Sequence, residues 1–480
     1  MSKKKENIGI YLTEIVKKYG ENVLQDINRV NALLMDLAPD NDKERKLIVM
    51  CLREGILAQL YIAKQNPMPE IVINRCVKQL ISDIWITESA AKYAVEIIAK
   101  VIGIDCVCEM QMTSKNSTDT AILLKGEKKV VDDLELEKVL DNVEVIGYKA
   151  FAFNNQITRV RIPKSLKKIM AKAFVNCHNL SHIVLESNID AISSSAFDGC
   201  NNIREIESYS TQYVCTNGIL INKEERKTIK AENRDNANLV VIPNGIQIIT
   251  NKTFEGNSAS TVQIPETVSK IEKRAFEGMN NLQSILVESY NKNYRSLDGV
   301  LHDQKGEELI KYPMSRKESS YYIEDSVKKI GRLCFSYARN LKMITLTGTL
   351  QKIDYAAFQF CSNLESLILP YGVGVIGEKA FQYCTKLKSV MLSRKIVEIE
   401  DCAFYQCTSL ESVSVPESVE RIGNYAFWGC KSLRIVTIQN EVEEIGYGAF
   451  EGCDRVCIKI RNNSYAEKYC RAHNINYEML

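Results

Sequence analysis

The stretch Val419-Glu-Arg-Ile-Gly-Asn-Tyr-Ala-Phe-Trp-Gly-Cys-Lys-Ser-Leu-Arg-Ile-Val-Thr-Ile438 decides the fold, because its pattern returns along the chain. The shared frame is V-x-x-I-G-x-x-A-F-x-x-C-x-x-L-x-x-I-x-I, and residues 373–392 fit it equally well. A fixed period between about 20 and 50 residues indicates a solenoid built from stacked copies of one small unit. The repeat phenylalanines, spaced by 23 residues within two runs, are Phe151, Phe174 and Phe197, then Phe335, Phe358, Phe381, Phe404, Phe427 and Phe450.

The end of each unit predicts a short strand. Leu410, Val413 and Val415 alternate with polar residues before Pro416, and this pattern is too short and too β-branched for a helix. The repeat glycine predicts a turn, and the Ala-Phe pair places a small residue beside a large one. Stacking of coils at the inter-strand spacing of about 4.8 Å would bury each phenylalanine between its neighbours.

Two intervals exceed the period, from Phe197 to Phe254 and from Phe276 to Phe335. They hold related phrases, Tyr213-Val-Cys-Thr-Asn-Gly-Ile-Leu and Tyr294-Arg-Ser-Leu-Asp-Gly-Val-Leu. Asn-Gly and Asp-Gly between extended apolar stretches favour type I′ turns, because both central residues need positive φ. The sequence therefore predicts two β-hairpins inserted in the stack.

The repeat frame, with its D-G-V-L insertions, resembles the bacterial leucine-rich repeats of the BspA type. The resemblance covers residues from about 143 to 480, and the closing segment from Asn463 to Ile475 resembles the cap that ends such arrays. It implies a leucine-rich repeat solenoid. Together with the helical pattern of the N-terminal quarter, the expected fold is α+β: an N-terminal helical bundle followed by a leucine-rich repeat solenoid of period 23 with two inserted β-hairpins. Members of this family present an extended surface to other proteins and are not known as a catalytic class.

The N-terminal quarter has a different pattern, with apolar residues at helical spacing in four stretches: 24–37, 47–60, 71–84 and 90–102. This pattern predicts a compact helical bundle. The sequence segments that begin at Tyr19 and at Leu33 resemble a helical module of bacterial cytosolic proteins. The polar run from Met112 to Thr120 predicts a linker. The expected domains are a helical bundle at 1–108, a linker at 109–120 and the capped solenoid at 121–480.

Composition restricts the partners and the location. The chain has 480 residues, and 62 basic against 60 acidic residues give a formal net charge of +2. Such a balance provides no global field for nucleic acid or acidic lipid, and no apolar run is long enough for a membrane span. Residues 6–14 lack the features of a secretory signal. We expect a cytoplasmic protein; the alternative is the cell surface, reached by an unrecognised export route.

Sixteen cysteines would imply a disulfide framework in a small secreted protein, but this chain is long. Seven of the cysteines follow the repeat phenylalanine by three residues, so that each lies in a different coil. They should form a column in which the Cα–Cβ vectors are parallel, and parallel vectors do not suit the geometry of a disulfide. We expect buried, reduced thiols rather than a metal ladder. Cys106-Val-Cys108 has no second pair at zinc-finger spacing, so we expect neither metal nor cofactor there. The column consists of Cys177, Cys200, Cys361, Cys384, Cys407, Cys430 and Cys453.

Two stretches of the chain resemble enzyme or metal-site motifs, but the repeat accounts for them. Gly372-Val-Gly-Val-Ile-Gly377 matches a dinucleotide fingerprint, but its last glycine is the repeat glycine and no βαβ unit surrounds it. His178 and His182 are four residues apart, yet the segment between them leads into a strand, so a helical metal pair is not expected. No nucleophile with an adjacent base is apparent, and no catalytic or metal-ligating residue is predicted.

The predicted function is non-catalytic protein recognition through the strand face of the solenoid. The residues that flank the central aliphatic of each strand should point outward, because side chains alternate. Two alternatives stay open: an enzyme or signalling protein whose helical module acts on targets chosen by the repeats, and a surface adhesin. The candidate binding residues are Arg159, Arg161, His182, Val184, Glu205, Glu207, Ser284, Leu286, Met343, Thr345, Ser366, Ile368, Ser389, Met391, Ser412, Ser414, Ile435 and Thr437.

Overall fold

A computed structural model gives the structure of the chain. It divides into two compact units, one of residues 1–126, 143–150 and 168–173 and the other of the remainder. The structure describes residues 8–38, 41–53, 56–64, 73, 76–77, 80, 88–104, 122–123, 140, 143–234, 238–439, 442–461 and 464–480.

The first unit is mainly helical, and it also includes three two-residue strands that belong to the solenoid ladder and are given below. Its helical elements are α1 (Ile8–Tyr19), the 3-10 helix η1 (Glu21–Gln25), α2 (Ile27–Leu37), α3 (Asp42–Arg53), α4 (Ile56–Lys64) and α6 (Glu88–Val101). Leu12, Val30 and Ile98 are fully buried in its core. The predicted helices are confirmed in three of the four stretches, the second being divided into α3 and α4, and α1 was not anticipated. The stretch 71–84 lies largely outside the described residues, as do Cys106, Cys108 and the predicted linker.

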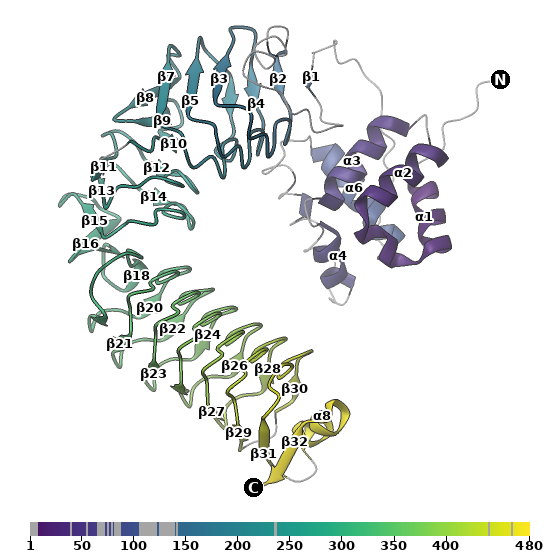
Figure 1. The fold of residues 1–480 in the computed structure, drawn as a ribbon, viewed down its shortest axis with the longest axis vertical. Helices are drawn as coiled ribbons and strands as arrows, with labels where there is room; N and C mark the ends of the chain where they lie inside the picture. The colour runs from purple at the N-terminus through teal and green to yellow at the C-terminus, as the bar shows by residue number, and fades with distance from the viewer. Residues whose placement is uncertain are drawn as a thin grey trace. The chain divides into compact units, whose positions relative to one another are not determined.

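Most coils of the solenoid contribute a longer and a shorter parallel strand, which confirms the predicted solenoid (Figure 1). The longer strands are β3 (Arg159–Ile162), β5 (His182–Leu185), β7 (Glu205–Ser208), β11 (Leu239–Val241), β13 (Thr261–Ile264), β15 (Ser284–Val287), β19 (Ser320–Tyr322), β21 (Met343–Thr345), β23 (Ser366–Ile368), β25 (Ser389–Met391), β27 (Ser412–Val415), β29 (Ile435–Ile438) and β31 (Cys457–Ile460). The shorter strands are β1 (Ile122–Leu123), β2 (Val145–Ile146), β4 (Lys168–Ile169), β6 (Ala191–Ile192), β12 (Ile248–Ile249), β14 (Lys270–Ile271), β20 (Lys329–Ile330), β22 (Lys352–Ile353), β24 (Val375–Ile376), β26 (Glu398–Ile399), β28 (Arg421–Ile422) and β30 (Glu444–Ile445).

The longer strands form separate parallel sheets, with the orders β3-β5-β7, β11-β13-β15, β19-β21 and β23-β25-β27-β29-β31. Their register follows the sequence period, so that Ser389 lies between Ser366 and Ser412. The last sheet continues into β32 (Asn476–Met479), which follows α8 (Tyr465–His473). The predicted helical cap is thus confirmed, and the Ser464 side chain accepts a hydrogen bond from the Glu467 amide at its start.

The two inserted hairpins are confirmed. The first pairs β8 (Tyr213–Thr216) with β9 (Ile219–Asn222), and the second pairs β16 (Tyr294–Leu297) with β17 (Val300–Asp303). Their turns have positive φ at both central residues: 53° and 75° at Asn217-Gly218, and 48° and 74° at Asp298-Gly299. A third strand, β10 (Lys227–Ala231) or β18 (Glu308–Lys311), rejoins the short-strand ladder in parallel. The hairpins lie where the sheets of longer strands are interrupted.

The repeat phenylalanines stack as predicted. The ring centroids of Phe381 lie 5.2 Å from those of both Phe358 and Phe404, with interplanar angles of 10° and 11°. In the second hairpin coil, which lacks the repeat phenylalanine, Tyr312 takes this place and stacks on Phe335 at 4.9 Å. The ring ladder therefore forms a central part of the core.

The repeat glycine has a role beyond the predicted turn. Gly377, Gly423 and Gly446 follow short strands without positive φ, and each lies against the backbone of the preceding coil. A Cβ atom added at Gly446 would lie 2.5 Å from the main-chain nitrogen of Asn424. Glycine is needed at this position because the two backbones approach closely.

The cysteine column consists of free, buried thiols, as expected. Each Sγ also contacts the main-chain carbonyl of the phenylalanine 26 residues earlier, as Cys384 does with Phe358 at 3.2 Å. The equivalent contacts of the other six span 3.0 to 3.2 Å. The thiol thus serves as a small buried donor to a carbonyl between coils, which the sequence pattern did not reveal.

Alkylation by iodoacetamide in native buffer is expected to leave most of the column unmodified. Burial raises the pKa of Cys361 and Cys407 to about 12, so little reactive thiolate forms there. Cys453 should react first, because a hydrogen bond from Cys430 lowers its pKa and it is 5% exposed. Mass spectrometry after unfolding without reductant should show every column cysteine modified; masses of oxidised pairs would contradict a reduced column.

Candidate functional site

The outward face of the longer strands is formed as predicted in the C-terminal coils. Leu367 and Val390 point into the core and are 2% and 7% exposed, whereas their strand neighbours Ile368 and Met391 are 67% and 63% exposed. The alternation follows from the pleat of the strand, which sends successive side chains to opposite faces. The structure thereby places the candidate binding residues on one surface, and their role in binding stays a prediction.

Val184 is the exception, and the expectation that it is exposed is wrong. It is 2% exposed although it lies in register between Arg161 and Glu207. An ion pair joins Nη2 of Arg159 on β3 to Oε1 of Glu207 on β7 at 3.7 Å and so passes across β5. The aliphatic stems of these long side chains cover Val184, which offers no surface to a partner.

The face is longer than the sequence predicted. Leu239 of β11 pairs with Thr261, which in turn pairs with the predicted Ser284, and Tyr322 of β19 pairs with the predicted Thr345. Leu239 and Tyr322 are 47% and 57% exposed. The positions were missed because outward residues were counted from the repeat phenylalanine, which the coils with hairpins lack. The aliphatic pattern of Leu239-Val-Val-Ile-Pro was the signal that could have found the first.

The chemistry of the face changes along the array. Over β3, β5 and β7 it is charged, and His182 Nε2 lies 3.4 Å from a carboxylate oxygen of Glu205. From β19 to β29 it carries exposed apolar side chains with serine and threonine between them. The exposed fractions are 57% for Tyr322, 56% for Met343, 67% for Ile368, 63% for Met391 and 41% for Ile435. We call these five side chains the apolar stripe.

A cleft lies at the first interruption of the sheet, where β7 is the last strand of its sheet. The amide of Ile206 on this edge donates to Oε1 of Glu232 at 2.7 Å. Glu232 is 5% exposed and also pairs through Oε2 with Nε of Arg234. Burial and the Glu232 carboxylate raise the pKa of the neighbouring Cys215 to about 12. The cavity has a volume of about 520 Å³.

The second interruption is closed differently. Ile285 is the counterpart of Ile206, nine residues after its repeat phenylalanine, and its amide donates to the main-chain oxygen of Gly299 at 2.8 Å. The guanidinium of Arg316 binds both the main-chain oxygen and the carboxylate of Asp298, which holds the hairpin turn in place. Main chain of the turn therefore covers the edge of β15, whereas a side chain covers the edge of β7.

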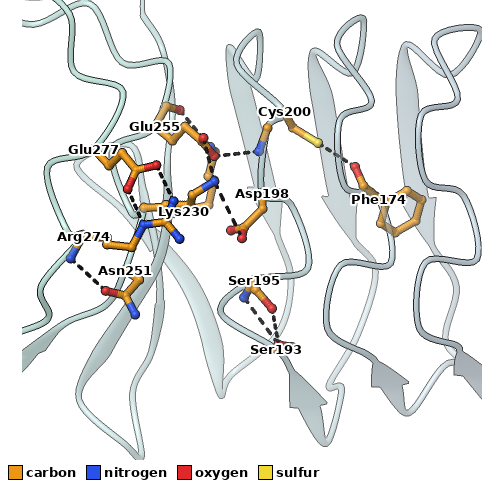
Figure 2. A network of polar contacts seen from close by, with 12 residues as sticks. Phe174, Ser193, Ser195, Asp198, Cys200, Lys230, Asn251, Glu255, Arg274 and Glu277 are labelled. Atoms are coloured by element: carbon orange, nitrogen blue, oxygen red, sulfur yellow. Dashed lines mark hydrogen bonds and ion pairs between the residues drawn. The ribbon is translucent and has the colours of Figure 1, made fainter. Parts of the chain in front are cut away.

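A buried charged cluster joins the coils around the first hairpin (Figure 2). Nζ of Lys230 on β10 donates to the main-chain oxygen of Glu255 at 2.8 Å, while the Glu255 carboxylate accepts from the Gly199 amide at 2.6 Å and pairs with Lys252 at 3.0 Å. Burial is the main cause that lowers the pKa of Lys230 and raises the pKa of Asp198 to about 6. The cluster links neighbouring coils where one coil lacks the repeat phenylalanine, so its evident role is structural.

The family model of the BspA type leucine-rich repeat region matches residues 132–236, 231–297, 314–408 and 397–478, more than half of the chain. The chain belongs to the BspA-type leucine-rich repeat family. It is similar in fold to a leucine-rich repeat protein from Eubacterium ventriosum, at 24% identity over 62% of this chain and 83% of that chain, with a TM-score of 0.50. A leucine-rich cell surface protein from Faecalibacterium prausnitzii is 22% identical over 68% and 85% of the two chains, with a TM-score of 0.45. No curated protein matches the chain in sequence.

The BspA-type coil accounts for the motifs that resembled catalytic or metal sites. The run from Gly372 to Gly377 lies in a turn and in β24, which another turn follows, whereas a dinucleotide site needs a helix there. His178 lies in a turn and His182 begins β5, so they share no helical face. Within the described ranges, no three His, Cys, Asp or Glu side chains gather as a metal site would require. In the same ranges, no helix is long and apolar enough to cross a membrane.

Proposed function

We propose that this BspA-type protein is a non-catalytic recognition scaffold that binds another protein through the apolar stripe. The observation that carries the proposal is the exposure of large apolar side chains on the outward faces of two sheets of longer strands, on β19 and β21 in one and on β23, β25 and β29 in the other. Contiguous exposed apolar surface on a soluble protein marks interaction sites more often than single scattered residues do. The parallel strands beneath it are fixed by regular pairing, as between β27 and β29, so the surface is preorganised.

The composition of the stripe fits a protein partner. Tyrosine and methionine are enriched in interface cores, where they bury large area, and charged residues are depleted there. Ser366, Ser389 and Ser412 lie in one column, which continues to Ile435 and runs beside Ile368 and Met391. These serines supply small polar groups that can hydrogen-bond to a partner. Concave or extended faces of repeat arrays bind partners in this way because neighbouring coils present equivalent positions.

The cytosol is the proposed location, and residues 1–108, 109–120 and 121–480 are the proposed helical module, linker and solenoid. Free thiols at all described cysteines support a reducing compartment, because an oxidising one favours disulfides. Cell fractionation followed by immunodetection tests this location. Recovery of the protein in the surface fraction would instead support the adhesin alternative.

Changing Ile368, Met391 and Ile435 together to Lys is expected to abolish capture of the partner. Three ammonium groups would need desolvation at the interface, where no charge is present to pair with them in the stripe. The exposed positions should tolerate the change, with the free energy of unfolding altered by about 0.5 kcal/mol or less per site. The measurement is quantitative affinity capture with the full chain as bait, followed by mass spectrometry and by urea unfolding of each variant.

The matched control is Val375→Lys with Val397→Lys. These valines are 38% and 48% exposed, and they lie outside the longer strands. The control variant should capture the same proteins as the unmodified chain. Undiminished capture by the triple variant, or equal loss in the control, would remove the apolar stripe as the binding surface.

A further inference from the structure

Two of the three interruptions between the sheets of longer strands arise from related hairpins, yet they leave different edges. At the second, the main chain of the turn pairs with the edge amide of Ile285. At the first, the carboxylate of Glu232 occupies the position of a neighbouring strand's carbonyl and bonds the amide of Ile206. A side chain satisfies one edge group only, whereas a strand would satisfy a row of them. The second hairpin also bonds the carbonyl oxygen of Ile285, which accepts from Ser296 Oγ, so it holds both main-chain groups of that residue. At the β7 edge the contact to Ile206 is made by a movable side chain, which a main-chain carbonyl can replace.

The cleft beside β7 has room for a chain segment. Its volume is about 520 Å³, and its walls include Ile206 and Ser208 of the edge strand and the hairpin turn at Asn217. The cleft opens on the strand face, because Glu205 and Glu207 also line it. An exposed sheet edge beside such a space is the arrangement that binds an extended peptide by strand addition.

The charged side chains that point outward next to the β7 edge determine which side chains an added segment should carry. Arg159, His182 and Glu205 form one column across β3, β5 and β7, while Arg161, Val184 and Glu207 form the next. A strand added beyond β7 would place two residues, separated by one, directly beside the two glutamates. Opposite charges at such cross-strand positions are favourable, and like charges are unfavourable.

We propose that the edge of β7 binds an extended peptide segment of a partner protein that carries Lys or Arg at two positions separated by one residue. A main-chain carbonyl of the segment replaces the Glu232 carboxylate on the Ile206 amide, and the basic side chains contact Glu205 and Glu207. The inference rests on the proposed strand-face recognition and adds to it a second contact region of defined chemistry.

The other charged residues near the cleft do not reverse the preference for a basic segment over an acidic one. Arg234 lies against the buried Glu232, with which it forms an ion pair. Arg204 also lines the cleft and precedes β7, so it does not occupy an outward position of the strand. Its positive charge opposes a basic segment. Glu207 already pairs with Arg159, and Glu205 lies 3.4 Å from His182, but each carboxylate has a second oxygen that can accept from a basic side chain.

The test uses two synthetic peptides and the full chain. The basic probe is Ile-Thr-Arg-Val-Arg-Ile-Pro-amide, the sequence of residues 157–163, because this segment forms β3 and pairs with a strand of the same ladder. The acidic probe has Glu in place of both Arg. Fluorescence anisotropy of labelled peptides at low ionic strength should show the basic probe binding roughly tenfold or more tightly than the acidic one.

The double variant E205K/E207K should invert this preference, which distinguishes a specific contact from general attraction. The matched control is S284K/L286K, which places lysines at the equivalent positions of β15. Because the hairpin turn covers that edge, the control should bind the basic probe as the unmodified chain does. Circular dichroism of each variant checks that it has folded.

Strand addition also predicts a dependence on the peptide backbone. Only alternate N–H groups of an added strand face the sheet. Methylating one alternate set of amide nitrogens in the basic probe should therefore abolish binding, and methylating the other set should preserve it. Equal effects of the two sets, no preference between the basic and acidic probes, or an uninverted preference in E205K/E207K would overturn the proposal. Each of these outcomes leaves the apolar stripe untouched, since its own test changes Ile368, Met391 and Ile435.

Discussion

Replacing Phe381 by Ala is expected to lower the free energy of unfolding by about 3–5 kcal/mol, because a large ring is lost and a cavity remains. Phe381 is fully buried and stacks at 5.2 Å on both Phe358 and Phe404. Neighbouring coils meet over this ring, so they cannot close the space without breaking their strand register. Urea unfolding followed by circular dichroism measures the loss.

Phe151 provides the comparison within the same ladder. It is 1% exposed, and the ring on which it stacks is Phe174, at 5.3 Å. In a solenoid whose stability is a sum of coil and neighbour terms, a substitution near the end removes fewer neighbour contacts. Phe151→Ala should therefore cost less than Phe381→Ala. Equal losses at the two sites would argue against nearest-neighbour stacking as the source of stability.

The contribution of Asp198 to the free energy of unfolding is expected to fall as the pH rises from 4 to 7. Burial raises the pKa of its carboxyl group to about 6, above the ordinary value of 3.8. The folded state therefore holds a proton that the unfolded state releases, so this contribution is complete below about pH 4 and is lost as the pH passes 6. A difference of about two pKa units corresponds to about 3 kcal/mol.

Asp198→Asn isolates this contribution, because the amide has nearly the same shape and does not titrate. Unfolding free energies of both proteins should be measured by urea at pH 4 and pH 7. Relative to the unmodified chain, the variant should gain about 3 kcal/mol between the two pH values. A constant difference between the two proteins would mean that Asp198 is ionised in the folded state at pH 4.

The fold could be predicted because its determinants are local and repeated. The 23-residue spacing of residues such as Phe358 and Phe381 fixed the coil, and the Asn-Gly and Asp-Gly pairs fixed both hairpins through their positive φ. α3 and α4 were harder to predict as two elements, because apolar residues keep helical spacing in both. The thiol contacts to main-chain carbonyls were also unpredictable, since they depend on the rise between coils.

The candidate face could be predicted where the repeat runs without interruption. Alternation alone located Ile368 and Met391 on the surface. It failed for Val184, because an ion pair between the flanking strands covers a residue that points outward. It could not find the contact between Glu232 and Ile206 either, since the two are 26 residues apart and meet only because the first hairpin turns back to the sheet.

The uniform register of the C-terminal coils has an evolutionary consequence. Ser366, Ser389 and Ser412 are related by the same 23-residue step and lie in one register. Deleting one whole coil, or duplicating it, would join surfaces of the same kind and keep the remaining strands in register. A gene of this design can lengthen or shorten by unequal recombination in units of about 69 nucleotides, which encode one 23-residue coil. The two hairpin coils have unlike edges, so they cannot be deleted or duplicated in the same way.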